Sequence, residues 1–407
     1  MDNPARSNRL KWALLAPMLL AAILFLGILS MWVPARWALS AFQLAVFALA
    51  AARIIRRRTI SIHPTAVLLG AAAAWGLVQV SAGWTVDRFK TLNEVLNWSV
   101  NLTAFALALE LSADRQRRER FLTAVLWFGT ALAAISMLTV FSSPPGMAFW
   151  IFDAGSDLRT LGPFVYYNQY AAFIEALLPL ALVRAILDPR RRVLYSVIGA
   201  LLLASVVAGG SRMGTILCLA EVAAIPLVAL TRGLVTRGTA ARVLLLSLST
   251  LAVLGAVAGW DVIWKRLQEP HPYTLRQDLL LSSLQMVRER PLNGFGLGTW
   301  PEVYPGFARF DDGLFANQAH NDWAQWAAEG GLPFFLLMLG VAGGAIRPAV
   351  RSLWGLGLLA VFLHGLIDYP FEQRPALAAF FFAMLGILMA QAGTQALPAA
   401  PLGLRKP

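Results

Sequence analysis

The sequence predicts an all-α, polytopic membrane protein with about twelve transmembrane helices and one long outer loop that contains short helices. Of its 407 residues, 58% are hydrophobic and 14% are charged, whereas soluble domains average about half apolar and a quarter charged. Apolar stretches of about 17–25 residues, each long enough to cross a bilayer core of about 30 Å, recur along the whole chain. Because the backbone in lipid must satisfy its own hydrogen bonds, each stretch should be helical.

The apolar stretches divide the chain into three parts within one integrated membrane domain. Residues 1–260 should hold helices 1–9, residues 261–330 the long outer loop, and residues 331–407 helices 10–12 and a tail. The first stretch is closely followed by others and lacks a clear cleavage site, so we expect an anchor rather than a signal peptide. The twelve spans are expected at residues 12–33, 35–52, 65–83, 94–111, 121–141, 163–186, 193–209, 211–230, 242–260, 331–346, 352–367 and 376–392.

Basic residues predict the orientation of these spans. Most of the 34 lysines and arginines lie in short segments on alternate sides, such as residues 53–58, 115–120 and 190–192. Short basic segments face the cytoplasm, which places both termini inside and the 261–330 loop outside. The net charge of +12 therefore indicates orientation in a membrane, and we expect no binding to nucleic acid.

Cysteine usage excludes two classes of site. The single cysteine, Cys218, lies in an apolar stretch, so the chain holds neither an internal disulfide nor a cysteine-rich metal site. Adjacent acids at Asp311 and Asp312 are expected to be solvated rather than to bind a metal. We expect no metal and no other cofactor.

The long outer loop begins with a predicted helix over residues 274–289. Apolar residues recur there at spacings of three and four, which is the period of one helix face. Arg276 lies in the first turn of this helix, and Pro291 follows its end. The arginine should therefore stand on a rigid element at the outer face.

A glycine-rich segment, "PLNGFGLGTWPEVYP", follows this helix. Gly294, Gly296 and Gly298 permit tight backbone turns. No βαβ pattern surrounds them, so they do not form a dinucleotide-binding motif. They form either the rim of a pocket or a plain linker.

A second loop helix is predicted over residues 317–329, with Asn317 as its cap. Gly330 and Gly331 should break it, and the next span should begin near Pro333. His320 would then stand on this helix, just outside the bilayer core. A histidine at an interface is often an ordinary surface residue, but its neighbours Asn321 and Trp323 favour a functional role.

Several polar residues lie at or within the apolar spans. Arg212, in "GGSRMG", either reaches to the interface or binds an anion, since its planar donors match phosphate oxygens. An aromatic belt explains the tyrosines near residue 167 but not the amide of Asn168. Glu175 and Glu221 lie deeper, where an acid is either functional or a hydrogen-bonded structural group.

Three stretches resemble the O-antigen ligase and O-antigen polymerase superfamily. They are "GGSRMG", the run from "TLRQDLLLSSLQMVRERPLNGFGLGTWPEVYP" to "AHNDWAQWAAEGGLPFF", and "HGLIDYPFEQRPALAAFFFAMLGIL". With "GPFVYYNQYAA", the resemblance covers roughly the second half of the chain. It implies a bacterial inner-membrane glycosyltransferase, metal-independent and inverting, whose long loop is periplasmic.

The resemblance also implies the site residues. Arg212 and Arg276 would lie near a pyrophosphate, and His320 would be the catalytic histidine of the long loop. Two arginines stabilise charge that grows on a departing pyrophosphate, and a neutral imidazole can accept or orient the proton of an attacking hydroxyl. The expected substrate-binding residues are Asn168, Asn321, Trp300 and Arg159, although packing is the favoured role for Trp300.

The implied partners are membrane lipids, an undecaprenyl-pyrophosphate-linked glycan and an acceptor. The acceptor is lipid A core for a ligase, a second lipid-linked glycan for a polymerase, or a protein for related transferases. The first five spans carry no recognisable acceptor motif that would decide among them. A bicarbonate-like solute transporter is the rival class, but no internal inverted repeat of the kind found in many transporters is visible.

Overall fold

The computed structural model describes residues 4–56, 62–155, 160–258, 264, 268, 274–309, 313 and 316–396. The described chain is built almost entirely of helices, as predicted. The long helices are α1 (Pro4–Leu29), α2 (Arg36–Arg56), α3 (Pro64–Ser81), α4 (Arg88–Leu111), α5 (Arg115–Ser142), α6 (Tyr167–Leu187), α7 (Arg192–Gly209), α8 (Arg212–Thr231), α9 (Arg237–Ala258), α13 (Asp322–Ser352) and α15 (Pro375–Ala396).

The shorter elements lie in the connections between these helices. An antiparallel hairpin of β1 (Met147–Ala148) and β2 (Phe152–Asp153) follows α5. The segment before α13 holds α11 (Thr274–Glu289), α12 (Trp300–Val303) and the 3₁₀ turn η1 (Tyr304–Gly306), and α14 (Leu356–His364) precedes α15. The helix predicted over residues 274–289 is therefore confirmed.

Within the described residues, eight helices are long and apolar enough to cross a membrane: α2, α3, α5, α6, α7, α8, α13 and α15. Each of the twelve predicted spans overlaps a helix, but the number of crossings stays a prediction.

One predicted span is wrong as a continuous helix. Residues 352–367 form only the nine-residue α14, which at about 1.5 Å per residue is too short to cross a bilayer core. The chain leaves α14 after His364 and enters an irregular segment at residues 365–374.

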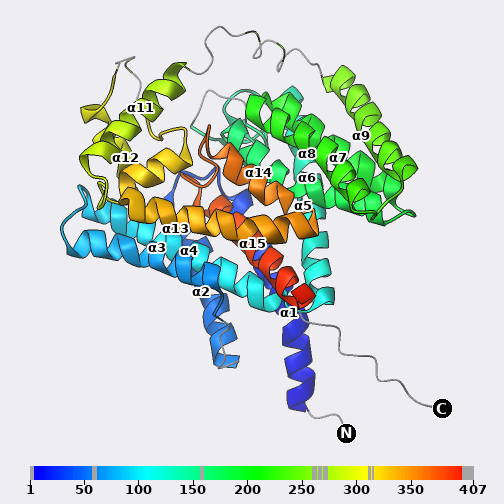
Figure 1. The fold of residues 1–407 in the computed structure, drawn as a ribbon, viewed down its shortest axis with the longest axis horizontal. Helices are drawn as coiled ribbons and strands as arrows, with labels where there is room; N and C mark the ends of the chain where they lie inside the picture. The colour runs from blue at the N-terminus through cyan, green and yellow to red at the C-terminus, as the bar shows by residue number, and fades with distance from the viewer. Residues whose placement is uncertain are drawn as a thin grey trace.

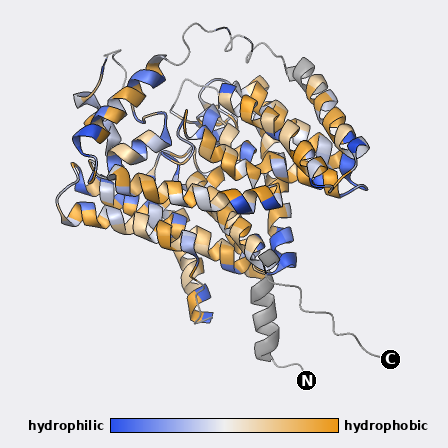
Figure 2. Ribbon diagram, viewed as in Figure 1, coloured by the Kyte–Doolittle hydropathy of each residue, from blue (hydrophilic) through white to orange (hydrophobic). Residues whose placement is uncertain are grey.

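The helices pack around two deeply buried members, α6 and α15. Helix α15 lies against α4, α6 lies against α7 and α8, and α13 lies beside α3, which lies beside α4 (Figure 1). Aromatic rings fill the centre, where Trp98 meets the rings of Phe334 and Phe382 at 5.1 and 5.6 Å. Figure 2 shows hydrophobic residues throughout the long helices and more hydrophilic residues around α11 and α12.

Helix α13 differs from the prediction at its start and agrees with it at its break. Asn321, and not Asn317, is the cap, because its Oδ1 accepts a hydrogen bond from the Ala324 amide at 2.9 Å. His320 therefore precedes the helix and has a φ of 50°. The helix is interrupted at Gly331, which has a φ of 68° and a ψ of −177°.

The glycine-rich turn packs against this break in α13. Glu329 accepts hydrogen bonds from the amides of Gly298 at 2.7 Å and Trp300 at 3.1 Å. Gly294 has a φ of 60°, and a Cβ atom added there would lie 2.2 Å from the Glu329 carbonyl oxygen. Only glycine fits this position, because its backbone conformation and its lack of a side chain are both required.

We predict that Gly294→Ala destabilises the protein by about 1–3 kcal/mol, because it combines a left-handed backbone with a clash against fixed backbone. The measurement is the midpoint of unfolding in detergent. Gly306→Ala is the matched control, since no atom lies within 4 Å of a Cβ added there. Equal midpoints for the two variants would show that the turn is not held against α13 as described.

Candidate active site

The candidate site is centred on the buried carboxylate of Asp368, in the irregular segment between α14 and α15. Asp322, the first residue of α13, fixes this segment. Its amide donates to the carbonyl oxygens of Gly365 at 2.8 Å and Asp368 at 3.1 Å. Its Oδ2 accepts from the Phe371 amide at 3.1 Å. The start of α13 thus holds Asp368 in place from both sides.

Helix α11 brings Arg276 to this carboxylate. The Arg276 guanidinium donates to Asp368 Oδ2 at 2.8 Å, and its side chain is 19% exposed. Burial alone lowers the pKa of Arg276, but the charge of Asp368 and the neighbouring tyrosines raise it above its usual value. The guanidinium is therefore permanently charged, and one end of it is pinned by the aspartate.

His320 approaches the same carboxylate from the loop before α13. Its Nδ1 lies 3.5 Å from Asp368 Oδ1, and 24% of its side chain is exposed. The ring meets Tyr369 edge-on, with centroids 4.8 Å apart. His320 holds this place with a φ of 50°, a left-handed backbone that non-glycine residues adopt infrequently and that is often found at functional sites.

The start of α6 completes the set around Asp368. The Tyr166 hydroxyl donates to Asp368 Oδ2 at 3.0 Å, and its ring stacks on Tyr369 with centroids 5.0 Å apart. The amide nitrogen of Asn168 donates to the same oxygen, and it also donates to the Tyr166 hydroxyl at 2.8 Å. The amide of Asn168, which an aromatic belt did not explain, therefore has a position in the site.

These partners decide the charge state of Asp368. Burial raises its pKa, but the hydrogen bond from His320 and the positive charges of Arg276 and His320 outweigh burial and hold the pKa below its usual value. The carboxylate is therefore ionised at neutral pH. A buried anion of this kind is stable only because cationic and neutral donors surround it.

The end of α8 that carries Arg212 is linked to this network through Ser211. Ser211 caps α8, accepting from the Gly214 amide at 3.2 Å, and its hydroxyl donates to Asn168 Oδ1 at 2.7 Å. Arg212 is the first residue of α8 and is half-buried. The capping serine thus ties the helix end that carries Arg212 to the residue that binds Asp368.

The other predicted substrate-binding residues lie differently. Asn321 caps α13 and donates to the Leu366 carbonyl at 2.7 Å, so it shapes the segment that carries Asp368. The Trp300 indole is fully buried, stacks on Tyr304 at 4.6 Å and donates to Ser283 Oγ at 3.0 Å. This geometry favours packing over a sugar contact for Trp300. Arg159 lies outside the described residues.

Three residues of the centre were missing from the predicted site: Asp368, Tyr166 and Tyr369. Asp368 was recognised only within the third resembling stretch, and Tyr166 only as a belt residue. The available signal was Asp368 itself, which directly follows an apolar stretch and is followed by Tyr369 and Pro370. That signal did not indicate the partners, since they come from segments far away in the sequence.

A second buried polar pair joins α14 to α6. His364 Nδ1 lies 2.7 Å from Glu175 Oε1, and both residues are fully buried, which favours the structural role for Glu175. In the part of the chain that the structure describes, no three His, Cys, Asp or Glu side chains are grouped to hold a metal ion.

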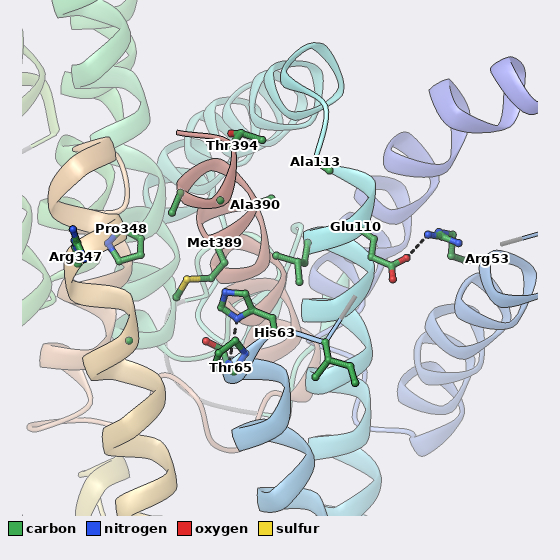
Figure 3. Close-up of a pocket in the computed structure, with 16 residues that line it drawn as sticks. Arg53, His63, Thr65, Glu110, Ala113, Arg347, Pro348, Met389, Ala390 and Thr394 are labelled. Atoms are coloured by element: carbon green, nitrogen blue, oxygen red, sulfur yellow. Dashed lines mark hydrogen bonds and ion pairs between the residues drawn. The ribbon is translucent and has the colours of Figure 1, made fainter. Parts of the chain in front are cut away.

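A large cavity of about 850 Å³ lies at the far ends of α2, α4, α13 and α15 (Figure 3). Arg53 and Arg347 line it together with His63, but Arg53 is paired with Glu110 at 2.5 Å. The His63 ring accepts a hydrogen bond from the Thr65 amide at 3.2 Å as the cap of α3. These contacts give Arg53 and His63 structural roles and do not extend the Asp368 centre.

Comparison with known protein families matches a segment that contains part of this site. Residues 197–339 match the family model described as O-antigen ligase. No curated protein matches the chain. The matched segment contains Arg212, Arg276 and His320, the residues that the resemblance implied. The match confirms that resemblance for residues 197–339, and together with the apolar helices it points to a multi-pass membrane protein.

Proposed function

We propose that the protein is an inner-membrane glycosyltransferase that moves an undecaprenyl-pyrophosphate-linked glycan to an acceptor sugar, such as lipid A core, at the periplasmic face. The observation that supports this proposal most strongly is that Arg276, His320 and Asn168 all contact the same buried carboxylate, that of Asp368. These side chains come from three distant segments and meet on an element outside the eight candidate spans. Such convergence supports a reactive site rather than a set of isolated interface residues.

The arginines suit the donor side of this reaction. Arg276 uses one nitrogen for Asp368, and the planar fork of N–H donors on a guanidinium matches the oxygens of a phosphate group. Arg212 stands at the N-terminus of α8, where helix amides also favour an anion. As the bond from the anomeric carbon to the phosphate oxygen breaks, its electron pair moves to the pyrophosphate. Two guanidinium groups stabilise that charge more strongly in the transition state than in the bound substrate.

His320 suits the acceptor side. Asp368 faces Nδ1, which favours the tautomer with a proton on Nδ1 and directs Nε2 toward an acceptor hydroxyl. The hydroxyl oxygen forms its bond to the anomeric carbon while its proton passes to Nε2. Attack opposite the departing pyrophosphate inverts the anomeric centre. Asp368 is a positioning residue in this scheme, and it also stabilises the imidazolium that forms.

The proposed reaction uses no metal. In this scheme the guanidinium groups supply the positive charge that a divalent cation supplies in many other transferases of phosphorylated sugars. The same chemistry with a second lipid-linked glycan as acceptor would be polymerisation. The geometry of the reacting groups is shared by the two reactions, so the acceptor alone distinguishes them.

We predict that His320→Ala and Arg276→Ala each lower glycan transfer by about 100-fold or more, since each removes a group that acts in the transition state. Transfer is measured as glycan attached to lipopolysaccharide in cells whose only copy of the gene is the variant. Arg288→Ala, an exposed arginine near the end of the same helix, is the matched control. Normal surface glycan in the His320→Ala strain, at wild-type protein levels, would overturn the assignment.

The lowered pKa of Asp368 predicts that the folded protein loses stability in acid. A depressed pKa adds stability that is present above the unfolded value of about 3.9 and is lost as the pH falls through the folded value. The unfolding free energy of the wild type should exceed that of Asp368→Asn by a constant amount from pH 7 to about 5. The difference should shrink below about pH 4. An unchanged difference at pH 3 would show that Asp368 is not an ionised partner of Arg276.

Deletion of the gene distinguishes ligase from polymerase. We predict that the deletion strain attaches no O-chain to its lipid A core, which is read from silver-stained lipopolysaccharide gels. The lipid-linked glycan should accumulate at full length because only its transfer is blocked. A core carrying one attached repeat would instead show that the protein polymerises the glycan.

A further inference from the structure

A cavity of about 290 Å³ lies next to the candidate active site and takes no part in the mechanism above. Residues of α2, α4, α13 and α15 line it, together with the glycine-rich turn and the loop before α13. Its most distinctive lining residues share one chemical group, the side-chain amide. These amides are Asn93, Asn97, Asn101, Gln318, Gln325 and Gln373.

The cavity and the catalytic centre are built by the same two segments. Gln318 stands two residues before His320, and Glu372 and Gln373 follow Asp368 in the segment between α14 and α15. Gln373 has a φ of 66°, so this segment carries a second strained residue at the cavity wall. Gly298 also lines the cavity, which confirms that the glycine-rich turn forms part of a pocket wall.

The amides are held in fixed orientations on α4. Asn93, Asn97 and Asn101 are spaced by four residues and therefore share one face of the helix. Gln43 Nε2 donates to Asn97 Oδ1 at 2.9 Å, and Asn97 Nδ2 donates to Glu94 Oε2 at 2.9 Å. Groups oriented in advance bind a ligand at a lower entropic cost than mobile ones.

One of these amides has an unmet hydrogen-bonding requirement. Asn101 is 3% exposed, and its Oδ1 has no hydrogen-bond partner among the described residues. A buried acceptor without a partner destabilises the folded protein. A ligand hydroxyl that enters the cavity can remove this cost by donating to Asn101 Oδ1.

The charges of the cavity favour a neutral ligand. Its charged lining residues are two bases, Arg36 and Lys90, and two acids, Glu94 and Glu372. Lys90 is paired with Glu302, and Arg36 donates to Asn93 Oδ1 at 3.3 Å. The lining therefore has no net formal charge, and its bases have protein partners. Phosphate fits this cavity less well than it fits the Arg276 side of the centre.

We propose that this cavity binds an uncharged sugar unit of one of the two substrates and places it beside the reacting atoms. Sugar hydroxyls both donate and accept hydrogen bonds, as the amides that line this cavity do. The volume is near the lower limit of about 300 Å³ for ligand sites, which suits one or two sugar rings. The inference rests on the proposed function, and it names the substrate group that specificity depends on.

The test is Asn101→Leu, which replaces the amide by an apolar side chain of similar size. Asn101 Oδ1 makes no hydrogen bond within the described structure, so the change should leave the fold intact, and a thermal melt in detergent checks this. Initial transfer rates are measured in proteoliposomes with two probes, core lipopolysaccharide and lipid-linked glycan. Both probes are isolated from a strain lacking the gene, and the concentration of each is varied in turn.

We predict that Asn101→Leu raises KM about tenfold for one substrate, equivalent to about 1.4 kcal/mol, and changes kcat less than twofold. The substrate whose KM rises is the one whose sugar occupies the cavity, and this separates donor from acceptor. Asn101→Ala should behave in the same way and serves if the leucine variant is unstable. Gln116→Leu, an exposed amide at the start of α5, should leave both KM values unchanged.

The outcomes separate this inference from the proposed function. Wild-type transfer combined with unchanged KM values in both Asn101 variants overturns the sugar site and leaves the glycosyltransferase intact. A fall in kcat alone also overturns it, because that result assigns Asn101 to the chemistry and not to binding. A wild type that transfers no glycan overturns the proposed function, and the sugar site with it.

Discussion

The ion pair between Asp368 and Arg276, at 2.8 Å, is the interaction on which the site depends. A carboxylate that is 1% exposed is costly unless cations and hydrogen-bond donors surround it. That requirement draws α11, the loop before α13 and the start of α6 toward one point, because each supplies a partner. The same anion partly neutralises Arg276 and binds His320, so the two side chains can lie close together before a substrate arrives.

Much of the helical framework could be predicted from the sequence, because apolar length and the pattern of basic residues are local signals. Helix α11 was predicted with its observed bounds, since its apolar period and Pro291 define it locally. The start of α13 was not, because Asn317 and Asn321 are both acceptable caps and only tertiary contacts choose between them. The Asn321 amide also binds the Leu366 carbonyl, and this contact, 45 residues along the chain, favours the later cap.

The candidate site shows the same division between local and distant information. Arg276 and His320 could be selected because the stretches that carry them resemble a known family. Asp368 was harder to select, because an acid after an apolar stretch is common at membrane interfaces, and its partners lie up to 202 residues away in sequence. The short α14 belongs to this set as well, because it ends at His364 and the irregular segment that follows it places the Asp368 carboxylate against Arg276 and His320.

The linkage between the Asp368 centre and the amide-lined cavity has a consequence for specificity. Asp322 forms hydrogen bonds on both sides of Asp368, with the Gly365 carbonyl before it and the Phe371 amide after it. The two residues that follow Phe371 form part of the cavity wall. The distance from the proposed leaving-group site to the proposed sugar site is therefore fixed by hydrogen bonds and not by a flexible loop. A rigid spacing of this kind selects substrates by the position of a sugar relative to the bond that reacts. It allows the glycan beyond that sugar to vary without affecting the chemistry.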